Sequence, residues 1–152
     1  MIIEQSDIFR ALRRNGKHIP GQILMPNQSF FCPKKEVVSK YIIPAYFQWL
    51  QTLSSGFWST QWDCDNFADA FKIFSAGFYK KRINKGAEGI AIGTIHYFAK
   101  SRAENGTGGA HAINIIFGEK DDIIQLWFVE PQNGEFLLLT PEEYKSIWML
   151  YI

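Results

Sequence analysis

Three residue types that cooperate in nucleophilic chemistry occur along this chain in the order cysteine, histidine, acid. Cys64 lies where a polar run passes into an amphipathic pattern, so its thiol is expected at the start of a helix. His111 opens one apolar segment with strand character, and Glu130 closes the next. A thiol reacts as its thiolate, which a helix N-terminus and a nearby imidazolium stabilise. The pattern predicts a cysteine nucleophile, with His111 as its base and Glu130 as the acid that orients the imidazole.

Each of these residues also has a plain structural interpretation. A cysteine at a helix start is commonly a small, partly buried side chain, and the charges of Asp63 and Asp65 beside Cys64 oppose a thiolate. His111 can be a satisfied strand-end residue and Glu130 a solvated one. The chemical interpretation gains from the short turn between the two strands, because an antiparallel pairing brings Glu130 back beside His111.

Further polar side chains extend the candidate site. Gln61, three residues before Cys64, can donate to an oxyanion together with the Cys64 backbone N–H, and Gln51 and Gln132 are alternatives. Two other histidines are less suited to the role of base, one in a proline-flanked loop and one in mid-strand: His18 and His96. Three carboxylates offer oxygen ligands for calcium without the loop pattern of an EF-hand, and a solvated helix face is the alternative: Asp63, Asp65 and Asp69.

The helices that position the cysteine are expected in the first half of the chain. Residues 1–35 contain glycine, proline and asparagine at short intervals, which predicts an irregular segment of loops with short extended pieces. Apolar residues recur at three- and four-residue steps over residues 36–53, which predicts a helix with a kink or break at Pro44. A second helix follows Asp63, its expected N-cap, and places Cys64 in its first turn.

The second half of the chain has the alternation typical of strands. Four strands joined by short turns are expected over residues 88–100, 110–117, 123–130 and 135–139. Consecutive strands with short connections form an antiparallel sheet. Thr140 has the signature of an N-cap for a short last helix. The predicted fold class is α+β, with N-terminal helices, one of them carrying Cys64, packed on a C-terminal antiparallel sheet.

Composition limits the classes of function. The 152 residues fit a single domain, residues 1–152, and a formal charge of +1 gives no basic field for nucleic acid or anionic membranes. No run reaches the roughly 18 apolar residues of a membrane span, and the acidic N-terminus does not resemble an export signal. We therefore expect a soluble, cytoplasmic chain that a partner can deliver elsewhere. Cys32 and Cys64 match no metal or redox spacing, and a bridge between them stays open.

The order and spacing of three short motifs resemble a known family. The motifs are Asp63–Ala68, Ala110–Asn114 and Val129–Gln132, within a region of about residues 61–134. They resemble the papain-like and transglutaminase-like cysteine peptidases, in particular the peptidase domain of fungal chimeric lectins and related bacterial and phage proteins. The resemblance implies a papain-like fold.

The resemblance also implies roles for the residues. Cys64 would attack an amide or peptide bond and form an acyl-enzyme, His111 would act as base and then acid, and Glu130 would orient it. This interpretation is a cysteine hydrolase with a protein or peptide substrate and no required cofactor. An amine in place of water would make the same site an acyl transferase. Lectin-associated members are similar in being calcium-dependent, which would give the carboxylates around Cys64 a purpose.

A second interpretation belongs to another class of function. The chain can be a papain-like shell, encoded by a phage or a bacterium, that serves as a binding or inhibitor protein with a chemically silent site. Its support is the small size, the aspartates that flank Cys64, and the many aromatic residues available for a contact surface.

Overall fold

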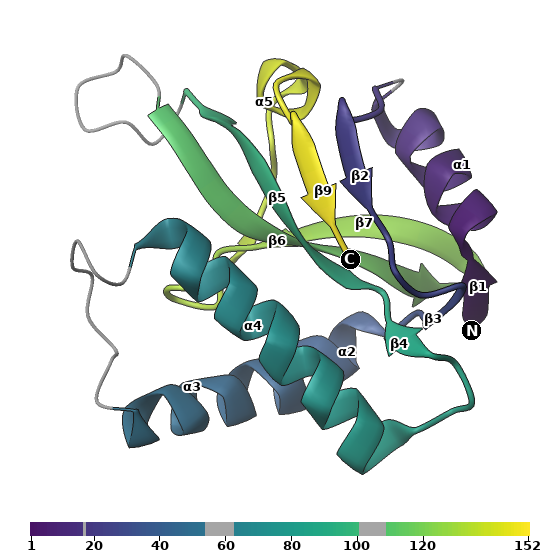
Figure 1. Cartoon of the computed structure of the whole chain (residues 1–152), viewed down its shortest axis with the longest axis vertical. Helices are drawn as coiled ribbons and strands as arrows, with labels where there is room; N and C mark the ends of the chain where they lie inside the picture. Colours follow the sequence, from purple (N-terminus) through teal and green to yellow (C-terminus); the bar gives the residue numbers. More distant parts are fainter. Residues whose placement is uncertain (17, 54–62, 101–108) are drawn as a thin grey trace.

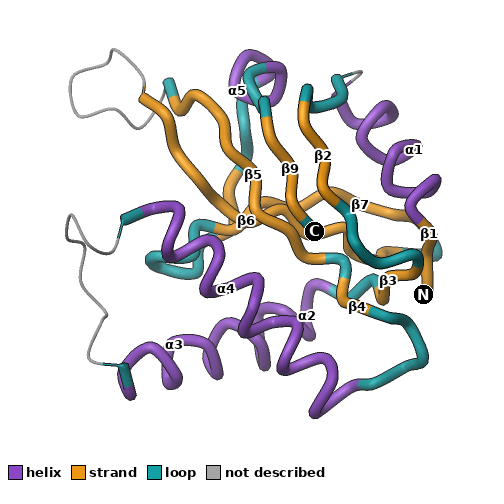
Figure 2. The backbone as a smooth tube through the Cα atoms, viewed as in Figure 1, coloured by secondary structure: helices purple, strands orange, loops and turns teal. Residues whose placement is uncertain are grey.

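A six-stranded sheet lies between two groups of helices (Figure 1, Figure 2). The computed structural model describes residues 1–16, 18–53, 63–100 and 109–152. The strand order across the sheet is β2–β9–β5–β6–β7–β8. The bounds are Gln22–Leu24 for β2, Ile92–Ala99 for β5, Gly109–Lys120 for β6, Ile123–Val129 for β7, Phe136–Leu137 for β8 and Met149–Tyr151 for β9. The predicted α+β class is confirmed.

One face of the sheet is covered by helices α3 (Ile43–Thr52) and α4 (Cys64–Phe78). Their inward side chains, with Tyr46 and Phe71 among them, form an apolar core with Ile116 and other residues of the sheet. The expected apolar stripe of the second helix is therefore its buried face. This layer places the start of α4 against the sheet.

The opposite face is covered by helices α1 (Gln5–Gly16) and α5 (Pro141–Lys145), which share a second core with the sheet. Helix α5 begins as predicted. Thr140 Oγ1 accepts a hydrogen bond from the Glu143 backbone N–H at 3.2 Å, and Glu143 Oε2 accepts one from the Thr140 N–H at 2.9 Å. This capping box satisfies two amide groups that the helix itself leaves unpaired.

The prediction for residues 1–35 is correct in its short extended pieces and wrong in leaving out a helix. The segment contains helix α1, strand β2 and two further short strands, β1 (Ile2–Glu4) and β3 (Ser29–Phe31). Helix α1 buries Ile8, Ala11 and Leu12, a three- and four-residue spacing that was visible in the sequence. The glycine and proline residues mark the connections between these elements rather than a continuous loop.

The prediction of an antiparallel sheet is correct for the consecutive strands β5 to β8 and for the pairing of β5 with β9. Strand β2 pairs parallel with β9, and a separate three-stranded sheet has the order β1–β3–β4, where β4 (Gly89–Ile90) runs parallel to β3. Parallel pairing joins segments far apart in sequence, so no turn signal announces it. The N-terminal segment is thereby attached to the end of the sheet and to the strand that precedes β5.

The first helical segment departs from a regular α-helix next to Pro44, where a kink or break was predicted. The segment consists of α2 (Lys35–Val37), a π-helical turn η1 (Val38–Ile42) and α3. Pro44 occupies the first turn of α3, where its missing N–H costs little. A second π-helical turn, η2 (Tyr79–Ile83), follows α4.

The turn between β6 and β7 is shorter than the expected turn over residues 118–122. Asp121 and Asp122 adopt φ values of 53° and 60°, as a two-residue hairpin turn requires, and β6 continues to Lys120. Gly118 is a strand residue, and a Cβ there would collide with the ring of Trp127. None of the helices in the described residues is both long and apolar enough to cross a bilayer.

Candidate functional site

Cys64 is the first residue of α4, as predicted, and its side chain is partly exposed. Asp63 precedes it in an extended conformation and acts as the N-cap. The Asp63 backbone N–H donates to Asn66 Oδ1 at 3.2 Å, and the Asp63 carbonyl accepts from the Phe67 N–H at 3.1 Å. These bonds fix the first turn of the helix and with it the direction of the Cys64 side chain.

His111 lies near the start of β6, directly opposite Tyr97 of β5. Its ring centroid is 5.9 Å from that of Tyr97, which is completely buried. His111 Nε2 is 2.8 Å from Glu130 Oε2, and Cys64 lies close enough to the same imidazole to raise its pKa. Because Nε2 contacts the carboxylate, Nδ1 is the ring nitrogen left for the thiol. The structure therefore brings the three predicted residues together.

Glu130 directly follows β7 and is 8% exposed. A tight turn holds its backbone: the Glu130 N–H donates to the Glu135 carbonyl at 2.9 Å, and its own carbonyl accepts from the Gly134 N–H at 2.7 Å. Gly134 has a φ of 77°, a conformation that favours glycine, and a Cβ there would lie 2.8 Å from the Cγ2 of Ile43 on α3. Helix α3 therefore supports the turn that presents the carboxylate.

The imidazole of His111 is positively charged at neutral pH. Burial of the ring, the largest single influence, lowers its pKa, but hydrogen bonds to Cys64 and Glu130 and the negative charge of both partners together raise the pKa to about 9. The side chains of His111 and Glu130 are only 18% and 10% exposed. The cluster is thus a sheltered thiol, imidazolium and carboxylate in a row.

Asn114 and Tyr46 hold the elements of the site in place. Asn114 is completely buried, and its Nδ2 donates to the carbonyls of Ala68 in α4 at 2.8 Å and Gly93 in β5 at 3.1 Å. The Tyr46 hydroxyl, on α3, donates to the carbonyl of Phe67 in α4 at 3.1 Å. Burial, followed by the charge of Glu130, raises the pKa of Tyr46. Asn114 ends one of the three motifs in the sequence, whereas nothing there distinguishes Tyr46 from the other apolar residues of its helix.

The three carboxylates that the sequence suggests for calcium make different contacts. A side-chain hydrogen bond with Asp65, followed by partial burial and the charge of Asp65, raises the pKa of Asp63. Asp69 Oδ1 instead accepts a hydrogen bond from Thr94 Oγ1 at 2.9 Å. Over the described ranges, no three His, Cys, Asp or Glu side chains are placed to hold a metal ion together.

The other candidate residues do not join Cys64, His111 and Glu130 in the described structure. Gln61, the predicted oxyanion donor, is outside the described residues. The alternative Gln132 has a buried side-chain nitrogen without a hydrogen-bond partner, and its backbone N–H donates weakly to Glu130 Oε1 at 3.4 Å. Cys32 is a free, completely buried thiol whose pKa burial raises to about 12, so it is unreactive. The open alternative of a bridge between the two cysteines does not occur.

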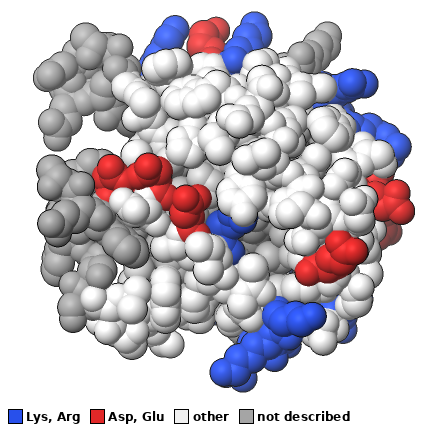
Figure 3. All heavy atoms as spheres, in the orientation of Figure 1, with Lys and Arg blue, Asp and Glu red and all other residues white. Residues whose placement is uncertain are grey.

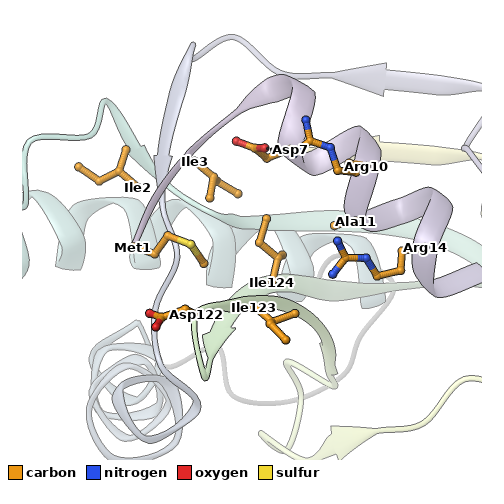
Figure 4. Close-up of a pocket in the computed structure, with 10 residues that line it drawn as sticks. All are labelled: Met1, Ile2, Ile3, Asp7, Arg10, Ala11, Arg14, Asp122, Ile123 and Ile124. Carbon is orange, nitrogen blue, oxygen red and sulfur yellow. Dashed lines mark hydrogen bonds and ion pairs between the residues drawn. The ribbon is translucent and has the colours of Figure 1, made fainter.

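A separate cavity of about 290 Å³ lies where the N-terminal strand, helix α1 and the start of β7 meet (Figure 4). Arg10 and Arg14 reach it from α1, and Asp122 from the hairpin turn. Arg10 is already paired with Asp7 at 2.8 Å. The residues of the Cys64 cluster do not line this cavity.

Two solved structures share the fold of this chain. One, titled "PSL1a-E64 complex", has a TM-score of 0.72 and 19% identity, over 99% of this chain and 51% of that one. The other is a crystal structure of Polyporus squamosus lectin bound to the human-type influenza-binding epitope Neu5Aca2-6Galb1-4GlcNAc, with a TM-score of 0.71 and 18% identity, over 99% of this chain and 49% of that one. This chain spans about half the length of each. No protein-family model and no curated protein matches it.

These matches contradict the assignment to the papain-like or transglutaminase-like cysteine peptidases. One title names a lectin, neither names a peptidase, and no family model or curated relative supplies one. The predictions of a cysteine hydrolase, of an acyl transferase and of a protein or peptide substrate are corrected accordingly, and the alternative of a binding protein fits the comparisons better. Three short motifs define a local arrangement of side chains, which does not by itself define a function.

Proposed function

We propose that this protein is a ligand-binding protein and that Cys64, His111 and Glu130 form the centre of its binding site. One observation carries the proposal: His111 lies 2.8 Å from Glu130, and Cys64 and Glu130 together raise its pKa to about 9. Strongly shifted pKa values concentrate at functional sites, because a fold seldom shelters a charge without using it. The three residues come from a helix start, a strand and a turn that separate contacts hold in place.

The chemistry of the cluster favours a ligand with an electrophilic group. The sulfur of Cys64 is the most nucleophilic atom of the three side chains, and the imidazolium can donate a hydrogen bond to an oxygen of the ligand. Asp63 and Asp65 add negative charge beside Cys64, which disfavours a purely anionic ligand. The ligand is expected to stay bound to the site.

The two ligands named with the similar structures are suitable probes: E64 and the trisaccharide Neu5Aca2-6Galb1-4GlcNAc. Titration calorimetry should compare the unmodified protein with Cys64→Ala, and Cys32→Ala is the matched control for the other cysteine. We expect E64 to bind the protein and Cys32→Ala equally, and Cys64→Ala at least about tenfold more weakly, a loss of roughly 1.4 kcal/mol.

Four results would contradict the proposal. Equal binding of E64 to the protein and to Cys64→Ala would remove the thiol from the site, as would binding of the trisaccharide alone with no effect of Cys64→Ala. Failure of both ligands to bind would leave the cluster without a binding role. Release of a cleaved product, followed by mass spectrometry of the titrated solution, would show turnover in place of binding.

A further inference from the structure

A long groove runs between the two main helical segments on the outside of the molecule. It consists of two adjoining cavities of about 580 and 470 Å³, which share Ala45, Phe78 and Arg82. Val37 and Ile83 line one end, and residues in the middle of α3 and α4 line the other. The two segments therefore run antiparallel along the groove. The residues of the Cys64 cluster do not line it.

Both walls of the groove repeat every four residues. The wall formed by α2, η1 and α3 contributes Val37, Tyr41, Ala45 and Trp49. The wall formed by α4 and η2 contributes two such rows, Ile73, Gly77 and Lys81, and Phe74, Phe78 and Arg82. Rows with this spacing are the ridges between which another helix packs. The shape of the groove thus matches a helix better than an extended strand.

The walls are apolar and incompletely covered. Tyr41 on one wall is 61% exposed and Ile73 on the other is 67% exposed, which are large exposed fractions for apolar side chains. Trp49 and Phe74 stack with ring centroids 5.5 Å apart and form part of the floor. Such a surface gains stability when a partner removes it from water.

Gly77 leaves the middle of the groove open. A Cβ at this position would meet no atom within 4 Å, and the backbone of Gly77 does not have the positive φ that favours glycine. A glycine inside a helix costs about 1 kcal/mol relative to alanine. Nothing in the fold of this chain requires a glycine at position 77, whereas a partner that approaches the helix backbone closely does.

The charges at the groove are of one sign. Lys40, Lys81 and Arg82 line it, and none of the other residues that line the two cavities is acidic. Basic side chains gather at the lower edge of the molecule, where α4 ends, while acidic ones gather over the start of α4 (Figure 3). Complementary charge selects a partner and speeds its association. The groove therefore favours an acidic partner.

We propose that this groove binds an acidic, amphipathic helix of a protein partner, independently of the Cys64 site. Helix α3 has 10 residues, so at about 1.5 Å per residue the groove beside it accommodates a helix of roughly three turns. Apolar side chains of that helix at positions i, i+3, i+4 and i+7 lie against Trp49 and Phe78, and its carboxylates face Lys81 and Arg82.

The test uses a synthetic 14-residue peptide with leucine at the apolar positions and glutamate and alanine elsewhere, and a twin in which lysine replaces glutamate. Fluorescence anisotropy of the labelled peptides measures binding at physiological salt. We expect the acidic peptide to bind at least tenfold more tightly than its twin, and the double variant Lys81→Glu/Arg82→Glu to invert this preference. The control variant Lys120→Glu/Lys145→Glu makes the same change of charge away from the groove and should leave the preference for the acidic peptide unchanged.

Gly77→Leu separates binding from folding. Leucine is a better helix former than glycine, so the variant should unfold at the same or a higher urea concentration. Its side chain nevertheless fills the groove and should lower the affinity for the acidic peptide at least tenfold. Gly77→Ala adds a smaller side chain and should lower the affinity for the acidic peptide less. Protein alkylated at Cys64 should bind the peptide normally, so this test does not depend on the proposed function.

Several results would overturn the proposal. Equal binding of both peptides would show an apolar surface without selection for acid, and no binding of either would leave the groove without a helix ligand. Unchanged binding to a folded Gly77→Leu protein would place the peptide elsewhere. Self-association in analytical ultracentrifugation that Gly77→Leu abolishes would make a second copy of this chain the occupant.

Discussion

His111 contacts Glu130 through Nε2 at 2.8 Å, and Cys64 raises the pKa of the same ring. The order of Cys64, His111 and Glu130, together with the short turn between β6 and β7, was enough to place the three side chains together. The contact between Tyr46 and α4, which supports these side chains, could not be predicted from the sequence. The hydroxyl of Tyr46 reaches α4 through the tertiary packing of two helices, and periodicity does not report on such a contact.

His111 should make the stability of the protein depend on pH. Its pKa is about 9 in the folded protein and about 6.5 in an unfolded chain, so its contribution is complete below pH 6.5 and is lost as pH rises through 9. Urea unfolding of the protein and of His111→Gln at pH 6 and pH 9.5 tests this. The stability difference between them should shrink at the higher pH, and Glu130→Gln should weaken this pH dependence. A difference that stays constant with pH would argue against a charged His111.

The same imidazolium should assist the reaction of Cys64 with iodoacetamide, in which sulfur bonds to carbon and iodide leaves. Replacing His111 with Gln removes the charge that hydrogen-bonds the sulfur, so alkylation at pH 7 should slow by about tenfold or more. Mass spectrometry of the alkylated protein gives the rate, with buried Cys32 as the internal reference. Equal rates in the two proteins would show that the imidazole does not act on the thiol.

Among the helices and strands, features set by neighbouring residues are predicted correctly, and features set by residues distant in sequence are not. The N-cap before α4, the capping box of α5 and the hairpin order of β5 to β7 all follow from neighbouring residues, and each was predicted. Helix α1 was missed because punctuating residues on both sides of it outweighed its apolar spacing. The π-helical turn before Pro44 was also missed, since nothing in the sequence distinguishes it from a kink.

The turn after β7 should be sensitive to Gly134→Ala. The substitution places a side chain at a φ of 77° and against Ile43, so it should destabilise the protein by roughly 1–3 kcal/mol. It should also displace Glu130 and slow alkylation of Cys64. Urea unfolding and alkylation rates measure the two effects, and Asn133→Ala in the same turn, which loses only an exposed hydrogen bond, is the control. Wild-type behaviour of Gly134→Ala would mean that α3 does not support the turn.

The contact of α4 with the sheet should depend on Asn114. Asn114→Ala removes two buried hydrogen bonds and leaves the carbonyls of Ala68 and Gly93 without this donor, which should cost roughly 2–5 kcal/mol. Thr94→Val removes one bond to the exposed Asp69 and should cost less. Denaturant unfolding gives both values. A cost for Asn114→Ala no larger than that for Thr94→Val would argue against its role as a clamp.

At the scale of the whole molecule, one sheet serves two apolar cores. Residues of β6 alternate between them: Ile113 and Ile115 belong to the core with α1 and α5, and Ile116 to the core with α3 and α4. The alternation was predicted, but the parallel strands that enlarge the sheet were not, because their partners are distant in sequence. Function was the least accessible property, since short motifs are compatible with more than one activity.

A shared sheet should make the two cores unfold together. Leu12→Ala removes a completely buried side chain from the core with α1 and should cost roughly 2–5 kcal/mol. Urea transitions of the variant followed by far-UV circular dichroism and by tryptophan fluorescence should still coincide, because Trp49 reports from the opposite face. Ile73→Ala, on the exposed side of α4, is the control with little cost. Two separated transitions would show that the faces are independent.

The parallel pairing of β2 with β9 has a consequence for the chain during its synthesis. Residues 22–24 leave the ribosome early, whereas their partners at 149–151 are added much later. Until then β2 lacks this neighbour, and unpaired strand edges on nascent chains promote association with other chains. Strands β5 to β7 pair through local turns and can form first. A chain interrupted before residue 149 therefore exposes an edge that the complete sheet covers.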